Sequence, residues 1–325
     1  MIDFTVPPYL HTISIPTPFP VGPVNVYLAE GDPLTLVDVG PLYDPARESL
    51  EKALVERGCR IADLQRVIVT HAHSDHYGLA AEVKCTSGAE VLAHAASVPW
   101  LEKRANTHRL AFYAQVMRWA GVPVKALAGF SKAWRSVERY DDPVTPDGVL
   151  ADGDLLRLGD EDWQVLHTPG HASGLLCLYQ PQRRLLISSD HLLRDISSNP
   201  VIEPPAPGET GRPRRLVTYM AQLQRVAELD VALALPGHGL PITDPRALIG
   251  ERLAFHEVRA RRMLEVLGDD MLTTHEIAGR LFTDLDPVNY FLALSEVIGH
   301  LQWLEVEGQA AHAERSGIAL WRALS

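Results

Sequence analysis

The chain contains the stretch Thr70-His71-Ala72-His73-Ser74-Asp75-His76, directly after the apolar run Val67-Ile68-Val69, which is typical of a buried strand. Protonated imidazoles this close together would repel one another, and neutral imidazoles buried together need partners, so a divalent cation resolves both problems. Side chains alternate in direction along an extended chain, so His71 and His73 can point to one side. The turn that follows can then bring Asp75 and His76 to a neighbouring site.

Three further residues with metal-binding side chains each follow a strand-like run: His171, Asp190 and His238. Open α/β sheets place their ligands where a strand ends in a loop. Taken alone, each of the three is equally well explained as a hydrogen-bonded loop residue. Together with the cluster they make five histidines and two carboxylates, which is enough for two cations, a bridging carboxylate and solvent.

Strand-like and helix-like runs alternate through residues 1–245, which predicts one α/β catalytic domain. Strands are predicted at 24–29, 34–38, 66–70, 90–93, 164–167, 175–179, 184–188 and 231–235, and helices at 45–57, 78–86, 216–229 and 245–267. Residues 95–140 interrupt this alternation with mostly helical character. They are either a packed insertion or a substrate lid, because binding residues often lie on segments added to a rigid scaffold.

Residues 246–325 are predicted to form a small helical, winged-helix-like domain, with helices at 274–282 and 291–305 and a hairpin over 310–321. Winged helices commonly bind nucleic acid through basic residues. From residue 265 onward, however, this chain has ten acidic and three basic residues, and residues 291–307 contain no Lys or Arg. We therefore expect the domain to pack against the catalytic domain or, in a homodimer, against a second subunit.

Composition narrows the class of protein further. The chain has 325 residues, of which 46% are hydrophobic and 22% charged, as is usual for a globular protein. Its net charge of −11 argues against nucleic acid and anionic membranes as partners. The three cysteines are far apart, which favours a reducing compartment. No secretory signal or membrane-spanning run is recognisable, so we expect a cytoplasmic protein.

Five motifs in order resemble those of the metallo-β-lactamase-fold superfamily: Leu-Val-Asp-Val-Gly at 36–40, Thr-His-Ala-His-Ser-Asp-His-Tyr-Gly at 70–78, Thr-Pro-Gly-His at 168–171, Ser-Asp-His at 189–191 and Pro-Gly-His-Gly at 236–239. The resemblance covers about the first 245 residues. It implies a four-layer αβ/βα sandwich with metals at one edge. With its added C-terminal domain, the chain resembles the glyoxalase-II-like group that carries a winged-helix-like domain at the same place.

The resemblance also implies the ligands of two ions. One ion is held by His71, His73 and His171, the other by Asp75, His76 and His238, and Asp190 bridges them. Asp38 of the first motif supports the metal loop in this family without binding metal. His73 stands where flavodiiron-type proteins have a carboxylate, and Asp190 stands where some lactamases have a cysteine, which disfavours both activities.

We predict a binuclear hydrolase of a small thioester or ester, glyoxalase-II-like, that uses a hydroxide bridging the two ions. Two close cations lower the pKa of bound water toward neutrality, and Asp75 is the candidate catalytic residue that orients this water or shuttles a proton. Nitrogen and oxygen ligands fit zinc first, with iron or manganese as alternatives. Two other reactions remain open: phosphodiester or RNA cleavage at the same two ions, and persulfide-type dioxygenation at one iron.

Four residues near the motifs have more than one possible role. His191 is predicted to be a supporting or structural histidine, and His167 to support the metal ligands. Arg194 either binds an anionic group of the substrate or pairs with a surface acid. Tyr77 either lines the pocket or packs in the core.

Overall fold

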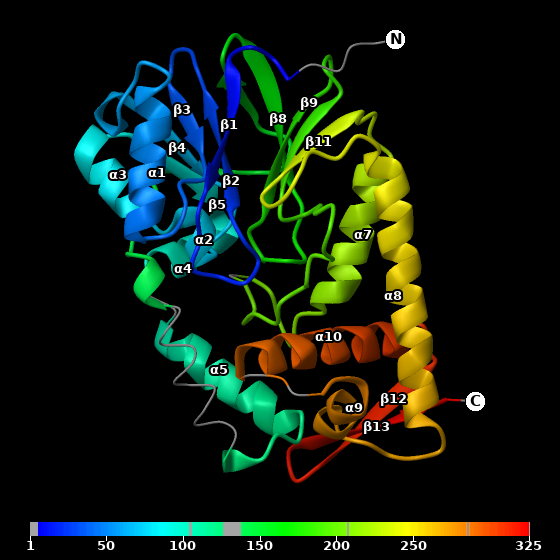
Figure 1. The fold of residues 1–325 in the computed structure, drawn as a ribbon. Coiled ribbons are helices and arrows are strands. Elements are labelled where there is room, and N and C mark those ends of the chain that lie inside the picture. Colours follow the sequence, from blue (N-terminus) through cyan, green and yellow to red (C-terminus); the bar gives the residue numbers. More distant parts are fainter. Residues whose placement is uncertain are drawn as a thin grey trace.

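The structure is a computed structural model that describes residues 6–103, 106–125, 138–206, 208–283, 285 and 287–324. Two β-sheets face each other, and helices cover the outer face of each sheet (Figure 1). One apolar core lies between the sheets. On the outer face of each sheet, one further core lies between that sheet and its helices. The predicted four-layer αβ/βα sandwich is therefore confirmed.

The first sheet has six strands in chain order: β1 (Leu10–Ile15), β2 (Val24–Ala29), β3 (Thr35–Val37), β4 (Arg66–Val69), β5 (Glu90–His94) and β6 (Gly148–Leu150). The first three pair antiparallel, and the pairs from β3 to β6 are parallel. Helices α1 (Asp44–Val55) and α3 (Ala80–Ser87) cover its outer face. In β2, Val26 and Leu28 pack in that outer core, and Tyr27 packs between the sheets, which is the period of two expected of a strand.

The second sheet has five strands in the order β11 (Leu233–Pro236), β10 (Leu185–Ser189), β9 (Leu176–Gln180), β8 (Glu161–His167) and β7 (Leu155–Leu158). Only β10 and β11 pair in parallel. Trp163 and Val165 of β8 are fully buried between the two sheets, and helix α7 (Arg215–Ala227) packs on the outer face.

The predicted C-terminal helices and hairpin are present as α8 (Pro245–Leu267), α9 (Thr274–Leu281), α10 (Pro287–Val306), β12 (Ala310–Arg315) and β13 (Ile318–Ala323). Helix α8 belongs to two cores. Leu248 and Ile249 pack with α7 on the sandwich, whereas Ala260 and Met263 pack in the C-terminal core. The domain boundary predicted after residue 245 thus falls in the first turn of a helix that both units share.

The described part of the helical insertion includes α4 (Val98–Leu101) and α5 (Asn106–Trp119). Leu101 of α4 packs in the outer core of the first sheet, whereas α5 joins the C-terminal core. Trp119 Nε1 donates to Glu314 Oε1 at 2.7 Å, and its ring meets Trp321 edge-on. Residues 104–105 and 126–137 of the predicted insertion lie outside the described residues. Where the structure describes it, α5 is packed against the C-terminal core; the substrate lid stays a prediction.

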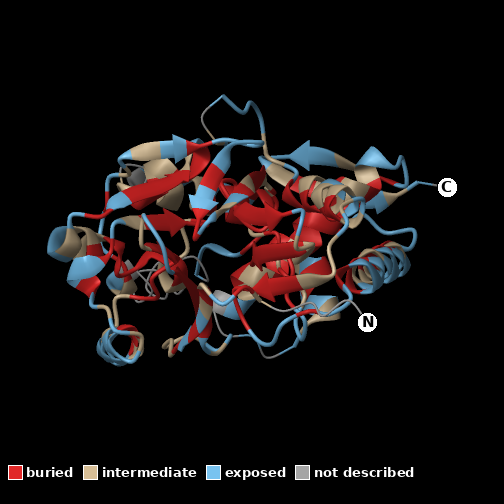
Figure 2. Cartoon of the chain, turned by 90° about the horizontal axis from the view of Figure 1, so that it is seen from above, coloured by how far each residue is buried: buried red, intermediate tan, exposed pale blue. Residues whose placement is uncertain are grey.

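Figure 2 shows buried residues concentrated in the strands and exposed residues on the outward faces of the helices. Within the described residues, no helix is both long enough and apolar enough to cross a bilayer. The remaining short helices are α2 (Ser74–Tyr77) and three 3₁₀ turns at Ile61–Asp63, Ala95–Ser97 and Glu138–Tyr140.

Candidate metal centre

The seven predicted ligands come together at one edge of the sandwich, where β4, β8, β10 and β11 end. Their donor atoms form three groups, in each of which all atoms lie within 4.8 Å of one another. These groups are His71 with His73 and His171, His71 with His76 and Asp190, and Asp75 with His76 and His238. Side chains from residues 71 to 238 therefore converge on one small region.

The first group is compact. Nδ1 of His73 lies 3.0 Å from Nε2 of His71 and 3.0 Å from Nε2 of His171. Helix α2 begins directly after His73, and the backbone N–H of His76 donates to the His73 carbonyl at 2.9 Å. This turn reverses the chain, so that the residues on either side of it face a common centre.

Asp190 lies between the first group and the rest. Its carboxylate is 3.5 Å from Nε2 of His76, 3.5 Å from Nε2 of His171 and 3.7 Å from Nε2 of His238. On the other side, Nε2 of His238 is 3.3 Å from Oδ2 of Asp75. A carboxylate in this position can contact an ion in either group.

The polar atoms at this centre indicate that it is built for cations. Nε2 of His76, Oδ1 of Asp190 and Nε2 of His238 are buried and have no hydrogen-bond partner among the described residues. Buried polar atoms are nearly always hydrogen-bonded, because leaving one unpaired costs free energy. A divalent cation removes this cost, and the nitrogen and oxygen donors suit Zn, Fe or Mn.

Hydrogen bonds on the far side of each ring orient the ligands. Nδ1 of His171 donates to the Asn199 carbonyl at 2.9 Å, and Nδ1 of His238 donates to the Pro23 carbonyl at 2.8 Å. A carbonyl can only accept, so in both neutral rings Nε2 keeps its lone pair and presents it to the centre.

Asp38 supports the centre without belonging to any of the three donor groups. One of its oxygens accepts from the Thr70 backbone N–H at 2.8 Å, and the other accepts from the Thr70 hydroxyl and from Nδ1 of His76. Asp38 and Ser189 both have positive φ angles, 58° and 44°. Non-glycine residues rarely adopt this conformation, and such strain tends to be retained near functional sites.

Burial and charge set the protonation of the ligands. Burial, with repulsion from His171 and other neighbours, lowers the pKa of His73 to about 3. Burial alone would lower the pKa of His76, but the nearby carboxylates, led by Asp190, outweigh it and raise that pKa. Burial would raise the pKa of Asp75, yet His76 and His238 lower it to about 2. Metal ligands must be deprotonated, so an ion held at this centre would displace the proton that the carboxylates favour on His76.

We expect Asp38→Asn to lower metal affinity or activity by about 10- to 100-fold, which is the usual cost of losing the partner that orients a metal-bound histidine. The amide keeps the shape of the carboxylate but loses its charge and one of its two acceptors. Metal titration and kcat/KM of the purified variant measure the effect. Wild-type values for both would contradict the supporting role.

Three of the four residues with open roles contact residues that do not belong to the ligand groups. The Tyr77 hydroxyl donates to Asp141 Oδ1, and only 3% of Tyr77 is exposed, so it packs in the core. Arg194 is half-exposed and pairs with Asp195. His191 is buried against the ring of Tyr219.

His167 holds the loop that carries His171. Its Nε2 donates to the Ser173 carbonyl at 2.9 Å, and its ring stacks on His94 with 3.7 Å between ring centroids. The supporting role predicted for His167 agrees with these contacts. Sequence analysis missed Pro23 and Asn199, because they act through backbone carbonyls that leave no side-chain signal.

Comparison with known proteins agrees with this geometry. A sequence model of the metallo-beta-lactamase superfamily matches residues 19–238. The probable metallo-hydrolase YqjP of Bacillus subtilis is 33% identical over 297 residues, which cover 91% of this chain and 92% of that protein. Human acyl-coenzyme A thioesterase MBLAC2 is 30% identical over 125 residues, 38% of this chain and 39% of that protein. A metallo-beta-lactamase family protein of Thermus thermophilus superposes with a TM-score of 0.85 at 26% identity, over 98% of this chain and 100% of that one.

Proposed function

The chain belongs to the metallo-beta-lactamase superfamily and is a metal-dependent hydrolase, and from this premise we propose that it uses two metal ions to hydrolyse a small thioester or related ester. The observation that carries the proposal is the position of Asp190, whose carboxylate lies within 3.7 Å of His76, His171 and His238. A single ion would not need a carboxylate shared between two sets of histidines. We propose zinc, because nitrogen and oxygen donors such as these suit it well.

The thioester part of the proposal draws on the similarity to human MBLAC2, which is an acyl-coenzyme A thioesterase. That similarity covers 38% of the chain, so it supports the reaction type more than the identity of the substrate. We also propose that the chain belongs to the glyoxalase-II-like group and that residues 246–325 form its winged-helix-like domain, in agreement with the order of α9, α10, β12 and β13.

In the proposed mechanism, each residue has a defined task. When bound, the two ions supply Lewis acidity toward a carbonyl oxygen and make hydroxide available at neutral pH. Asp75 accepts hydrogen bonds from the attacking water and orients it, and its pKa of about 2 keeps it ionised for this role. Asp38 holds Nδ1 of His76, and the Asn199 carbonyl holds Nδ1 of His171, so the ligand rings do not rotate during the reaction.

Charge in the C-terminal unit argues against nucleic acid as the substrate. Glu296 of α10 pairs with Arg259, and Glu305 of α10 pairs with Arg214, so these arginines already have acidic partners. A surface that binds phosphates needs free Lys and Arg side chains. We therefore propose that this unit packs against the catalytic domain instead of binding nucleic acid, and that the substrate is a small molecule.

Elemental analysis combined with one substrate panel tests the proposal. On the same sample, we expect two metal ions per chain and hydrolysis of thioesters that is lost after chelation and restored by metal. Lactones, phosphodiesters and RNA complete the panel. One iron per chain with consumption of oxygen and a persulfide would favour a dioxygenase instead, and cleavage of RNA with inert thioesters would favour a nuclease.

A further inference from the structure

Residues 197–203, the connecting segment, link the candidate metal centre to the C-terminal unit although they form neither helix nor strand. Four of these seven residues are buried: Ser198, Pro200, Ile202 and Glu203. Helices and strands are fixed by their own backbone hydrogen bonds, whereas a buried segment without them depends on partners elsewhere in the fold. The position of the connecting segment is therefore set by the residues that it contacts.

On one side, the connecting segment holds the loop of His171 at two points. The Asn199 carbonyl accepts from Nδ1 of His171 at 2.9 Å. Oε2 of Glu203 accepts from the backbone N–H of Ser173 at 2.7 Å, two residues further along the same loop. One hydrogen bond thus orients the ligand ring, and the other holds the backbone that carries it.

The connecting segment also holds the loop of Asp190. The Ser198 hydroxyl donates to the backbone carbonyl of Asp190 at 2.5 Å, and only 3% of Ser198 is exposed, so the bond is shielded from water. Asp190 and His171 belong to different donor groups of the centre. A displacement of the connecting segment would therefore reach ligands of both groups.

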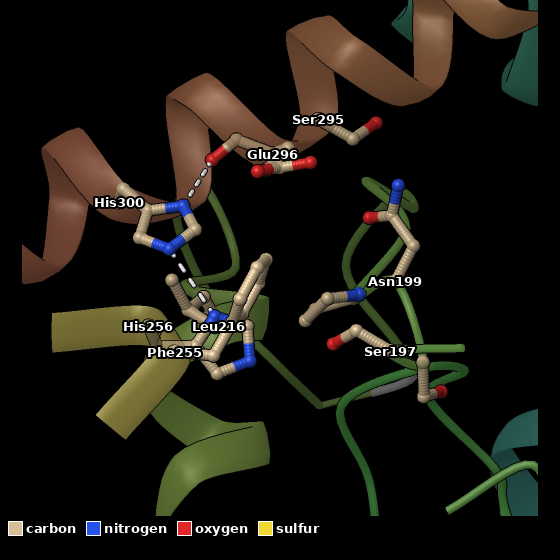
Figure 3. A pocket seen from close by; sticks show the side chains of 10 residues that line it. Ser197, Asn199, Leu216, Phe255, His256, Ser295, Glu296 and His300 are labelled. Atoms are coloured by element: carbon tan, nitrogen blue, oxygen red, sulfur yellow. Dashed lines mark hydrogen bonds between the residues drawn. The ribbon is translucent and has the colours of Figure 1, made fainter. Parts of the chain in front are cut away.

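On its other side, the connecting segment is anchored on helix α10. Nδ2 of Asn199 donates to the Leu292 carbonyl at 3.2 Å. The backbone N–H of Ile202 donates to the Ser295 hydroxyl at 3.4 Å, which is the longer and hence the weaker of the two bonds. Figure 3 shows the side chain of Asn199 pointing from the segment toward α10, from which Ser295 projects. The Ile202 side chain is buried in the C-terminal core.

Packing alone does not fix the connecting segment against α10. A pocket lies between them, lined by residues 197–200 on one side and by Phe255, His256 and Ser295 among the residues of α8 and α10 on the other (Figure 3). Atoms that border a pocket have fewer van der Waals contacts to restrain them. The hydrogen bonds to α10, above all that of Asn199, therefore contribute much of the restraint.

We propose that the C-terminal unit positions the metal ligands of the catalytic domain: α10 fixes the connecting segment, which in turn fixes His171 and Asp190. Asn199 is the central positioning residue, because α10 holds its side chain while its carbonyl holds Nδ1 of His171. The proposal deepens the two-ion function and rests on it for the presence of the ions. It does not depend on which ester is cleaved.

The physical link is the tautomer and direction of the His171 ring. While the Asn199 carbonyl accepts from Nδ1, the lone pair of Nε2 points at the centre. If the anchor on α10 is lost, the carbonyl moves more freely, the bond to Nδ1 opens more often, and the ring spends less time in the orientation that binds an ion. Metal affinity falls, and the Nδ1–H proton exchanges faster with water.

Asn199→Ala tests the link, because it removes the donor to Leu292 and keeps the Asn199 carbonyl. Zinc affinity is measured by competition with a chelator, and exchange of the His171 Nδ1–H proton by NMR of histidine-labelled, zinc-loaded protein. We expect about fivefold weaker zinc binding and about fivefold faster exchange, as for the loss of one hydrogen bond. Ser295→Ala, which removes the acceptor of the weaker bond, should change both in the same direction by about twofold.

Ile277→Val separates positioning from general stability. Ile277 lies on α9, is fully buried in the same C-terminal core, and has a side chain that cannot form hydrogen bonds. This variant should unfold at a lower temperature, because it loses a buried methyl group, yet bind zinc and exchange its His171 proton as wild type does.

Two results would overturn the proposal: exchange at His171 in Asn199→Ala that equals that of wild type, or exchange in Ile277→Val that is accelerated as much as in Asn199→Ala. Wild-type protein that binds zinc but cleaves no thioester would refute the proposed reaction and leave the positioning role intact. Wild-type protein that binds no metal ion would refute both.

Discussion

Replacing His73 and His76 together with alanine is expected to remove bound metal and to reduce hydrolysis by about 10³-fold or more. His73 contacts both other histidines of its group, and His76 belongs to two of the three donor groups. Metal ions contribute several kcal/mol of transition-state stabilisation, and each 1.36 kcal/mol is a tenfold change in rate. Elemental analysis and kcat/KM for the best thioester of the panel measure the two losses.

The matched control also loses two imidazoles. His11 and His312 are partly exposed and pair with Glu30 and Glu305, away from the candidate ligands. The double variant His11→Ala and His312→Ala should keep its metal and its activity. Wild-type hydrolysis by metal-free His73→Ala/His76→Ala protein would refute metal-dependent catalysis at this centre.

Gly237→Ala is expected to lower activity about 100-fold, although residue 237 supplies no ligand atom. A Cβ at this position would lie 2.2 Å from Oδ1 of Asp190 and 2.9 Å from Cε1 of His76, both far inside contact distance. Either the carboxylate or the β11 loop must move, and a displacement of about 1 Å in a catalytic site can cost about 100-fold in rate. Metal stoichiometry and kcat/KM report the change.

Gly250→Ala is the matched control for this glycine. Residue 250 lies within α8, and a Cβ there has no heavy atom within 4 Å. Removing a helical glycine should raise the free energy of unfolding by about 0.5–1 kcal/mol and leave activity unchanged. Equal activity of the Gly237→Ala and Gly250→Ala proteins would rule out the tight packing of Asp190 against the β11 loop.

Much of the fold was predictable where the sequence carries a complete local signal. Helix α8 has its predicted bounds, because Asp244 caps it by accepting from the Ala247 N–H, a proline occupies its first turn and Gly268 ends it. Strands β1, β6 and β7 were not predicted. β6 and β7 have only three and four residues, too few for alternation to stand out. In β1, polar and apolar residues alternate between prolines at 7, 8 and 16, and this signal was missed.

The candidate site was predictable to the level of residue type and strand end. The seven predicted ligands converge, because parallel strands end at the same edge and metal-binding side chains follow them. Tyr77 has the same neighbours in sequence yet faces Asp141 in the core. Whether a side chain in this segment points to the metal centre or into the core depends on the turn of α2, which the residue pattern does not specify.

The sequence by itself determined the superfamily, the α/β sandwich and the residues of the centre, because chemistry and strand periodicity are local properties of the chain. Only the tertiary structure decided that the insertion and the C-terminal unit share one core, with Trp119 packed against Trp321. It alone also brought the carbonyls of Pro23 and Asn199 behind two candidate ligands. Apolar faces and backbone carbonyls are alike along the whole chain, so their partners are chosen only when distant segments pack together.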